Sequence, residues 1–476
     1  MKKLLLMLLF PVLSLAQENQ KVPNFFPQQT SYHSTPENLD MPTTQWSDLA
    51  DVSWYNDTDL NFEISTAEEF AGLAQLVIGG ESFADKTLNL TANLDLAGHL
   101  WTPIGTGVDT PFSGTFDGNN YTISNLSINL PDDSFVGMFG HVVSGSIRNI
   151  NLETAEVYGL DAVGSIVANV FSSTAYNLHA NNVTVVGTDF NIGGLSGAIL
   201  TGSTMENCSA TNVNVSGESQ IGGLLGSVWD RSHLKNSYST GVASGNYLIG
   251  GLVGFTTFAF TPDINSVSYC YSRVNVTGNL GRVGGLYGGA QGALLIENSY
   301  ATGTATANEF AGGFIGAAGN IQVINSYFDY ETSEHLDGIG GWEGPVLEVG
   351  LEARTSESMK TEAFVAELNQ NAEEGAIWFM GDETNDFYPI FNETLSVDNV
   401  VVNKALVQLY PNPVVNELHV KLNQDIQSIE LYNANGQMLK TLKSVNKISV
   451  SDFPKGVYFL KIRTNETTQF EKFIKK

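Results

Sequence analysis

The sequence predicts an all-β fold: a parallel β-solenoid (β-helix-like) with small helical caps, followed by a C-terminal β-sandwich. A glycine-rich phrase recurs seven times at intervals of 27 to 34 residues, and self-similarity of this kind is typical of stacked repeats. Short β-branched segments lie between the phrases, and a tail of different composition follows them. Aligned on one position, the phrases give the corner glycines Gly137, Gly164, Gly194, Gly223, Gly251, Gly285 and Gly313.

Each repeat has three parts. The glycine phrase comes first, a middle segment such as Leu234–Tyr238 follows, and a β-branched segment such as Val213–Val215 closes the unit. Three short strands per turn build a coil of about nine rungs, spaced about 4.8 Å apart. Glycine is expected at each corner because it tolerates a positive φ and lets neighbouring backbone approach closely. One apolar column is expected inside the coil, made of Leu195, Leu224, Leu252, Leu286 and Phe314.

Two polar columns are also expected. A repeated asparagine predicts a ladder in which each side-chain amide bonds to the next rung. A repeated tyrosine predicts a stripe, explained either by packing within the ladder or by stacking on sugar rings. The asparagines are Asn207, Asn236, Asn298 and Asn325, and the tyrosines are Tyr238, Tyr271, Tyr300 and Tyr327.

Residues 1–16 have the pattern of a signal peptide. Two lysines precede a short apolar run, and small residues precede an expected cleavage between Ala16 and Gln17. Residues 17–58 are rich in Pro, Gln, Asn, Ser and Thr, which predicts a flexible N-terminal arm. No later stretch reaches about 18 apolar residues, so no transmembrane segment is predicted.

The solenoid is predicted to span 59–330. At its start, Ser65 and Glu68 have the spacing of a capping box, and an apolar stripe after them predicts a short helix over the open end of the coil. Residues 331–395 are predicted to cap the far end, with a helix over 356–368, because an uncovered end would expose a strand edge. The side chains expected over the last rung are Trp378, Tyr388 and Phe391.

Residues 396–404 are expected to be a linker, and 405–476 a separate β-sandwich of seven short strands. Asn435 and Gly436 form a dipeptide that favours a hairpin turn between two of these strands.

The net charge of the chain changes near the start of this tail. Residues 18–402 hold 9 Lys or Arg against 44 Asp or Glu, whereas the last 74 residues hold 11 against 6. An acidic body argues against nucleic acid as a partner, because nucleic acid binding needs a cationic surface.

The two cysteines, Cys208 and Cys270, fall at equivalent places in their repeats with one repeat between them. Two rungs separate them by about 9.6 Å, beyond the roughly 7 Å that a disulfide spans between Cα atoms. Two buried thiols are therefore expected.

Two family resemblances follow from these motifs. The repeats, with Gly-Gly-Leu-x-Gly and Asn-Ser-Tyr-x-Thr-Gly, resemble the GLUG repeat of secreted bacterial surface proteins. Residues 409–476 resemble the type A C-terminal sorting domain of the type IX secretion system of Bacteroidetes. That resemblance implies passage through the outer membrane, removal of the tail, and release or attachment at the cell surface. Its motif residues are Tyr410, Pro411, Asn412, Pro413, Asn435, Gly436, Gly456 and Tyr458.

Candidate metal sites depend on the histidines and on the acidic residues of the sequence. Some proteins with these repeats resemble IgA-cleaving metallopeptidases, but the seven histidines contain no His-Glu-x-x-His pair. No cofactor is predicted, and calcium is the one metal left open. One candidate loop has calcium-loop spacing but carries Phe62 where that loop needs glycine. The loop residues are Asp57, Asp59, Asn61 and Glu68, and a second candidate row before the glycine phrases is Asp133, Asp161, Asp189, Glu218 and Glu309. Solvated turns are the preferred explanation of this row.

A carbohydrate-cleaving site needs two or three carboxylates that converge on one face. The richest charged clusters are Asp230, Arg231 and His233 within the coil, and His335, Asp337 and Glu343 beyond it. Exposed turns explain both clusters without any catalytic role.

The preferred hypothesis is a secreted, non-enzymatic rod, adhesin-like or ligand-binding, because most of its recurrent residues have a structural explanation. The alternative is a polysaccharide lyase or hydrolase with its site in a groove of the coil, and a third hypothesis is a spacer without a ligand. The expected partners are the type IX machinery and a glycan, host or matrix ligand. The expected location is outside the cell or on the outer-membrane surface, as a monomer.

Overall fold

The computed structural model describes residues 41–476 except for 257–263, 345–347, 371–377, 392–407, 422–425, 434–437, 444–445 and 465–467. The chain divides into two compact units, one ending at Asn392 and one beginning at Glu393. Several predicted features lie outside the described residues: the cleavage site at Ala16 and Gln17, the linker 396–404, and the hairpin turn at Asn435 and Gly436.

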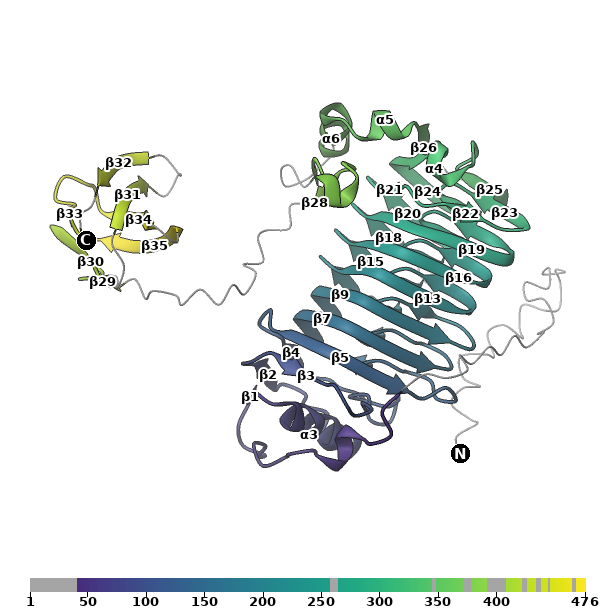
Figure 1. Ribbon diagram of the computed structural model, residues 1–476, viewed down its shortest axis with the longest axis horizontal. Helices are drawn as coiled ribbons and strands as arrows, with labels where there is room; N and C mark the ends of the chain where they lie inside the picture. The colour runs from purple at the N-terminus through teal and green to yellow at the C-terminus, as the bar shows by residue number, and fades with distance from the viewer. Residues whose placement is uncertain are drawn as a thin grey trace. The chain divides into compact units, whose positions relative to one another are not determined.

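The first unit is a parallel β-solenoid of about ten turns, one more than expected. Figure 1 shows its turns stacked in order along the chain. Each strand pairs in parallel with the strand one turn away, so that Val215 lies beside Val185 on one side and Ala243 on the other. One stack of strands contains β5 (Thr122–Asn129), β7 (Ser146–Gly159), β9 (Thr174–Gly187), β13 (Ser209–Gly222), β16 (Tyr238–Gly250) and β19 (Tyr271–Gly284).

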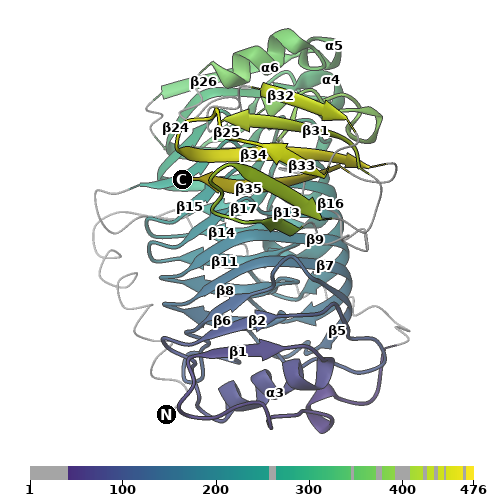
Figure 2. The same ribbon diagram turned by 90° about the vertical axis from the view of Figure 1, so that its left-hand side faces the viewer.

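The glycine phrases lead into a second stack of strands, which faces the viewer in Figure 2. It contains β6 (Phe139–Val143), β8 (Val167–Phe171), β11 (Ser196–Leu200), β14 (Leu225–Val228), β17 (Val253–Thr256), β20 (Tyr287–Glu297), β24 (Ile315–Asp329) and β25 (Ile339–Trp342).

The third side of each turn carries the middle segment of the repeat. Its separate strands are β1 (Asn61–Ile64), β2 (Thr87–Leu90), β4 (Thr115–Asp117), β12 (Thr204–Glu206), β15 (His233–Lys235) and β18 (Asn265–Ser268). The remaining short strands of the coil are β3 (Leu94–Asp95), β10 (Ile192–Gly193), β21 (Tyr300–Ala301), β22 (Ala305–Thr306), β23 (Glu309–Gly312) and β26 (Glu348–Arg354). The three-part repeat thus corresponds to the three sides of a turn.

A continuous apolar core fills the coil. The predicted column is confirmed, because the side chains of Leu195, Leu224, Leu252, Leu286 and Phe314 are all 0% exposed. The two cysteines also lie in this core as free, buried thiols, as expected.

The register of the first two glycine phrases differs by one residue from the sequence alignment, because Val136 pairs with Val163 and so places Gly137 beside Gly164. Val163 pairs with Ile192, which places Gly164 beside Gly193 and not beside Gly194. Ser165 then takes the place of the second glycine, and its hydroxyl donates to the carbonyl of Gly194 at 2.6 Å. A small side chain is tolerated here because it finds a hydrogen-bond acceptor on the next rung.

The N-terminal end is covered by α3 (Ala67–Ile78), shown in purple in Figure 1. Its capping box lies one residue later than predicted: the Thr66 hydroxyl accepts from the Glu69 amide, and the Glu69 carboxylate accepts from the Thr66 amide. Within the predicted flexible arm, the described residues 41–58 contact the coil through a few side chains, Trp46, Ala50, Trp54 and Tyr55. The short helix η1 (Trp46–Asp48) buries Trp46, whose indole donates to Leu96 O at 3.0 Å.

The C-terminal cap contains α4 (Tyr330–Ser333), α5 (Ser356–Met359), α6 (Glu362–Asn369), β27 (Trp378–Phe379), η2 (Glu383–Asn385) and β28 (Ile390–Phe391). The single helix predicted over 356–368 is therefore two helices, because Thr361 caps a new one by accepting from the Phe364 amide. The aromatic residues of the cap also differ from the prediction. They pack against the side of the coil, on the tyrosine column, rather than over its last rung.

The second unit consists of two antiparallel sheets that share one apolar core, which agrees with the predicted β-sandwich. One sheet contains β29 (Gln408–Tyr410), β30 (Glu417–Lys421) and β33 (Lys447–Ser449), and the other contains β31 (Ile426–Asn433), β32 (Met438–Lys443), β34 (Gly456–Thr464) and β35 (Thr468–Lys475). In the described part of the chain, no helix has the length and apolar character needed to span a membrane.

Candidate functional site

The corner glycines are explained by packing alone. None of the seven has a positive φ. Instead, a Cβ at Gly223 would lie 2.1 Å from Gly251 O, and one at Gly251 would lie 2.1 Å from Gly285 O. Successive rungs therefore approach too closely for any side chain, and these glycines offer no functional group.

The predicted asparagine ladder exists only in part. The Asn207 amide donates to Asn177 Oδ1 at 3.0 Å, but the Asn236 amide donates to Glu206 at 3.4 Å. The shared property of the four asparagines is a left-handed φ between 45° and 58°. Asparagine is one of the few residues that adopts this conformation readily, so the backbone of the corner explains the repetition.

The tyrosine column is covered by the C-terminal cap. Tyr271, Tyr300 and Tyr327 are 2%, 0% and 4% exposed, and Trp378 packs on the first two at ring-centroid distances of 6.0 and 5.5 Å. The rings of Tyr271 and Tyr300 stack in parallel, 5.1 Å apart. Of the two explanations for the stripe, the structure supports packing, since a sugar ring has no access to these three faces.

The charged clusters do not form a catalytic arrangement. Asp230 pairs with its neighbour Arg231 at 3.2 Å, and both have a positive φ in a tight turn. The imidazole of His233 lies 2.8 Å from the hydroxyl of Ser266 on the next rung. In the other cluster, Glu343 pairs with Arg282, and His335 lies 2.6 Å from the carbonyl of Ala305.

The candidate calcium residues are used by secondary structure. Asn61 begins β1, Glu68 lies in the first turn of α3, and the Asp59 carboxylate accepts from the Asn56 amide at 2.8 Å. Over the residues that the structure describes, no three His, Cys, Asp or Glu side chains are grouped so that they could hold a metal ion.

A shallow groove of about 440 Å³ crosses β9, β13, β16 and β19, the strands that run towards the lower right in Figure 1. Two rows of polar side chains line it. The hydroxyl row consists of Ser216, Ser244 and Thr277, and the amide row consists of Glu218, Asn246 and Asn279.

The amide row is held in place by hydrogen bonds between rungs. The Asn246 amide donates to the Glu218 carboxylate at 2.7 Å, and the Asn279 amide donates to Asn246 Oδ1 at 2.8 Å. The hydroxyl row is aligned by strand register, in which Ser216 pairs with Ser244 and Ser244 with Thr277. Between the rows lies a glycine row of Gly187, Gly217 and Gly245.

Part of the predicted acidic row is assembled at the edge of this groove. Burial, followed by the negative charges of Asp161 and Glu218, raises the pKa of Asp189 to about 6. Burial also raises the pKa of Asp161, against the hydrogen bonds that it accepts from Asn191 and the Ala162 amide. The sequence located these carboxylates, but it did not reveal the groove, because its glycines and hydroxyls resemble ordinary turn residues.

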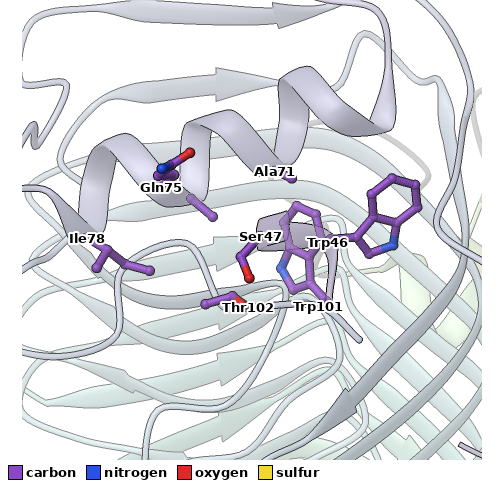
Figure 3. A pocket seen from close by; sticks show the side chains of 8 residues that line it. Trp46, Ser47, Ala71, Gln75, Ile78, Trp101 and Thr102 are labelled. Atoms are coloured by element: carbon purple, nitrogen blue, oxygen red, sulfur yellow. The ribbon is translucent and has the colours of Figure 1, made fainter. Parts of the chain in front are cut away.

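A second, smaller cavity of about 200 Å³ lies under α3, and Figure 3 shows the side chains around it. The indoles of Trp46 and Trp101 form part of its wall, and both indole N–H groups already donate to backbone carbonyls at 3.0 Å. Ala71 and Ile78 of the helix close the other side. The cavity is therefore mainly apolar and belongs to the contact between the cap and the coil.

In the second unit, Tyr410 ends β29, Pro411, Asn412 and Pro413 follow it, Gly456 begins β34, and Tyr458 lies within β34. Asn412 Oδ1 accepts from the Ile474 amide at 2.9 Å, and the Tyr458 hydroxyl donates to Pro454 O at 2.8 Å. The Tyr410 ring is 49% exposed and stacks on His419 at 5.2 Å. These contacts hold the ends of the sandwich together.

Comparison with curated proteins gives two partial matches. One stretch of 114 residues is 40% identical to halomucin of Haloquadratum walsbyi and covers 23% of this chain and 1% of that protein. Another of 86 residues is 37% identical to the "Putative Gly-rich membrane protein" of Evansella cellulosilytica and covers 17% of this chain and 10% of that protein. The chain thus spans a tenth or less of the length of either relative.

Among solved structures, the coil resembles a crystal structure described as a "putative immunoglobulin A1 protease" from Bacteroides ovatus. The TM-score is 0.39 at 18% identity, over 71% of this chain and 93% of that chain. A likeness at this level supports no argument about activity.

The tail gives the most specific match. Residues 408–476 match the family described as the secretion system C-terminal sorting domain. This sorting domain indicates that the chain is secreted and exported to the cell surface, by engaging the type IX machinery.

Proposed function

We propose that the chain is a GLUG-type, non-enzymatic β-solenoid that the type IX system displays outside the cell, where the polar groove across β9, β13, β16 and β19 binds a ligand. The groove itself is the observation that supports this proposal. It is built from hydrogen-bonded polar side chains of successive rungs, on a part of the coil that the C-terminal cap leaves uncovered.

The repeats support the GLUG resemblance through their geometry. The phrase glycines allow close approach of the rungs, and the apolar residue after them fills the core. These features account for the recurrent residues of the repeat without a catalytic role, which leaves the outward-facing residues to determine what the coil binds.

The test is binding of the labelled mature protein to arrays of glycans and host matrix proteins, and to whole cells. Saturable binding to one of these surfaces is the expected result. A protein that binds none of them would be a spacer, and the proposal would then be wrong.

One observation favours the alternative, a carbohydrate-cleaving enzyme. Glu218 lines the groove, and the nearby Asp189 has a raised pKa. Glycosidases combine a general acid whose pKa is raised with a second carboxylate that is ionised. Against it, Asp189 is not among the residues that line the groove, and the Glu218 carboxylate is bonded to Asn246. Release of reducing ends or unsaturated products from polysaccharides, abolished by Glu218→Gln, would establish the enzyme instead.

A further inference from the structure

We infer that the groove takes one linear, uncharged polysaccharide chain laid along the axis of the coil. This inference rests on the proposed function, since it names the ligand class of the same groove.

The groove owes its shape to the glycine row. A Cβ at Gly245 would lie 2.2 Å from Ile221 Cδ1, and one at Gly187 would lie 2.0 Å from Ile192 Cδ1. The side chains of these core isoleucines occupy the positions that a Cβ would take. The backbone can therefore approach the core this closely only at a glycine. The hydroxyl row and the amide row therefore stand on either side of a strip of bare backbone.

The groove is periodic along the coil. Its lining comes from four successive strands, and neighbouring strands lie about 4.8 Å apart, so its ends are roughly 14 Å apart. Each of the last three strands presents one hydroxyl and one carboxylate or amide at equivalent places. A polymer that repeats its hydroxyl groups at each unit can satisfy these positions one after another.

The charge of the groove favours a neutral ligand over an anionic one. No Lys or Arg lines it, and its one carboxylate, Glu218, already accepts a hydrogen bond from Asn246. Residues 18–402 carry 44 acidic against 9 basic side chains, which repels anionic polymers. No cationic side chain in the groove can pair with a uronate or sulfate group, whereas the exposed Ser244 and the rest of the hydroxyl row can both donate to and accept from the hydroxyls of a neutral chain.

The backbone disfavours an extended peptide. β13 is paired with β9 on one side and with β16 on the other, and β16 is paired in turn with β19. A peptide strand binds a sheet through a free edge, and these strands present none inside the groove. Recognition must therefore come from side chains, which suits a ligand with hydroxyl groups.

The polar groove also has a boundary towards the N-terminus. At the first rung of the groove, Gly187 is already flanked by Val186 and Thr188 instead of a hydroxyl and an amide. On the rung before it, Gly159 pairs with Gly187 and is flanked by Tyr158 and Leu160. Tyr158 is 6% exposed. The groove therefore recognises a short stretch of a longer chain.

The experiment compares the full mature chain with Ser244→Trp, which fills the middle of the groove. The matched control is Val242→Trp, because Val242 is 44% exposed on the same strand but does not line the groove. Thermal unfolding first establishes that both variants are folded. Affinity is then measured by calorimetry and on arrays for neutral β-glucan, xylan and mannan oligosaccharides, for uronate, sulfated and amino-sugar glycans, and for unstructured peptides.

The expected result is binding of a neutral oligosaccharide that Ser244→Trp weakens roughly tenfold or more, while Val242→Trp leaves it unchanged. Neutral binding that both variants retain would place the ligand elsewhere and overturn the inference. Binding of only charged glycans or peptides would overturn the ligand class while leaving the proposed function standing. Absence of binding to every glycan, matrix protein and cell would overturn both.

Discussion

At the scale of the residue, neighbouring positions at each corner of the coil have two different structural roles. The phrase glycines provide close approach, whereas the positive φ belongs to the residues just before them, such as Phe135, Asn191 and Leu248 with φ of 62°, 60° and 56°. Most of these residues are not glycine, so the turn is held by packing and hydrogen bonds. For example, the Asn191 amide donates to Asp161 at 3.1 Å.

Gly223→Ala is expected to destabilise the coil by about 2–3 kcal/mol, because the new Cβ would collide with the carbonyl of Gly251 and the stacked rungs cannot separate locally. The control is Gly107→Ala, where a Cβ meets nothing within 4 Å. Thermal unfolding of both variants tests this, and equal melting temperatures would contradict the packing explanation.

Asp189→Asn is expected to stabilise the protein at pH 7 more than at pH 4. Since folding raises the pKa of Asp189 from its ordinary value of 3.8 to about 6, the folded chain binds the proton more tightly, and stability falls as pH rises through this window. The side chain is partly exposed, so solvent screening limits the gain to about 1 kcal/mol.

Melting temperatures of Asp189→Asn and the wild type between pH 4 and pH 7 measure this difference. Asp133→Asn is the control, since Asp133 is exposed on a turn in the same predicted acidic row. A gain that does not depend on pH would show that burial and the neighbouring carboxylates are not its cause.

At the scale of the element, the C-terminal cap is a side cover for the coil. The hydroxyl of Tyr388 donates to the buried Asp329 at 2.5 Å, and the Tyr327 hydroxyl donates to Glu367 of α6 at 3.0 Å. Arg273 of β19 pairs with Asp386. These polar contacts surround the apolar contact of Trp378 and Phe391 with the tyrosines, and together they fix the cap to several rungs at once.

Trp378→Ala is expected to cost about 3–5 kcal/mol and to loosen the cap, because it removes a side chain that is 1% exposed from between Tyr271, Tyr300 and Phe391. Hydrogen exchange should accelerate in α6 while β9 and β13 stay protected. The neighbouring Phe379 is 39% exposed, so Phe379→Ala is the control and should change stability by less than about 0.5 kcal/mol. Equal exchange in both variants would mean that Trp378 does not hold the cap.

At the scale of the whole molecule, the chain consists of two structurally separate units. The coil has its own apolar core and its own caps, and the tail has a core of its own. Stacked turns each contact mainly their neighbours, so the coil is expected to fold independently of the tail.

Deletion of residues 408–476 is therefore expected to leave a folded coil that stays in the periplasm, whereas the full chain reaches the cell surface or the medium. Cell fractionation followed by immunoblotting measures the distribution, and circular dichroism of the purified deletion variant checks the fold. Export of the truncated chain at the normal level would show that the tail is not the export signal.

The sequence determined the repeat, the core and the tail, because these depend on local patterns. Spacing of the glycine phrases predicted the stacked turns, and alternation of apolar residues predicted which side chains fill the coil, as Leu224 and Leu252 confirm. The motif residues around Tyr410 and Tyr458 likewise led to the sorting domain through a resemblance that the family match supports.

Only the tertiary structure determined which residues of different turns lie side by side. It placed Trp378 on the tyrosine column instead of the end of the coil, shifted Gly164 by one residue in register, and brought Asp189 close enough to Asp161 and Glu218 to change its pKa. It also showed that Gly187, Gly217 and Gly245 form the floor of a groove. The physical reason is that local preference sets which strands form, whereas burial, register and the approach of distant segments depend on how all the rungs pack together.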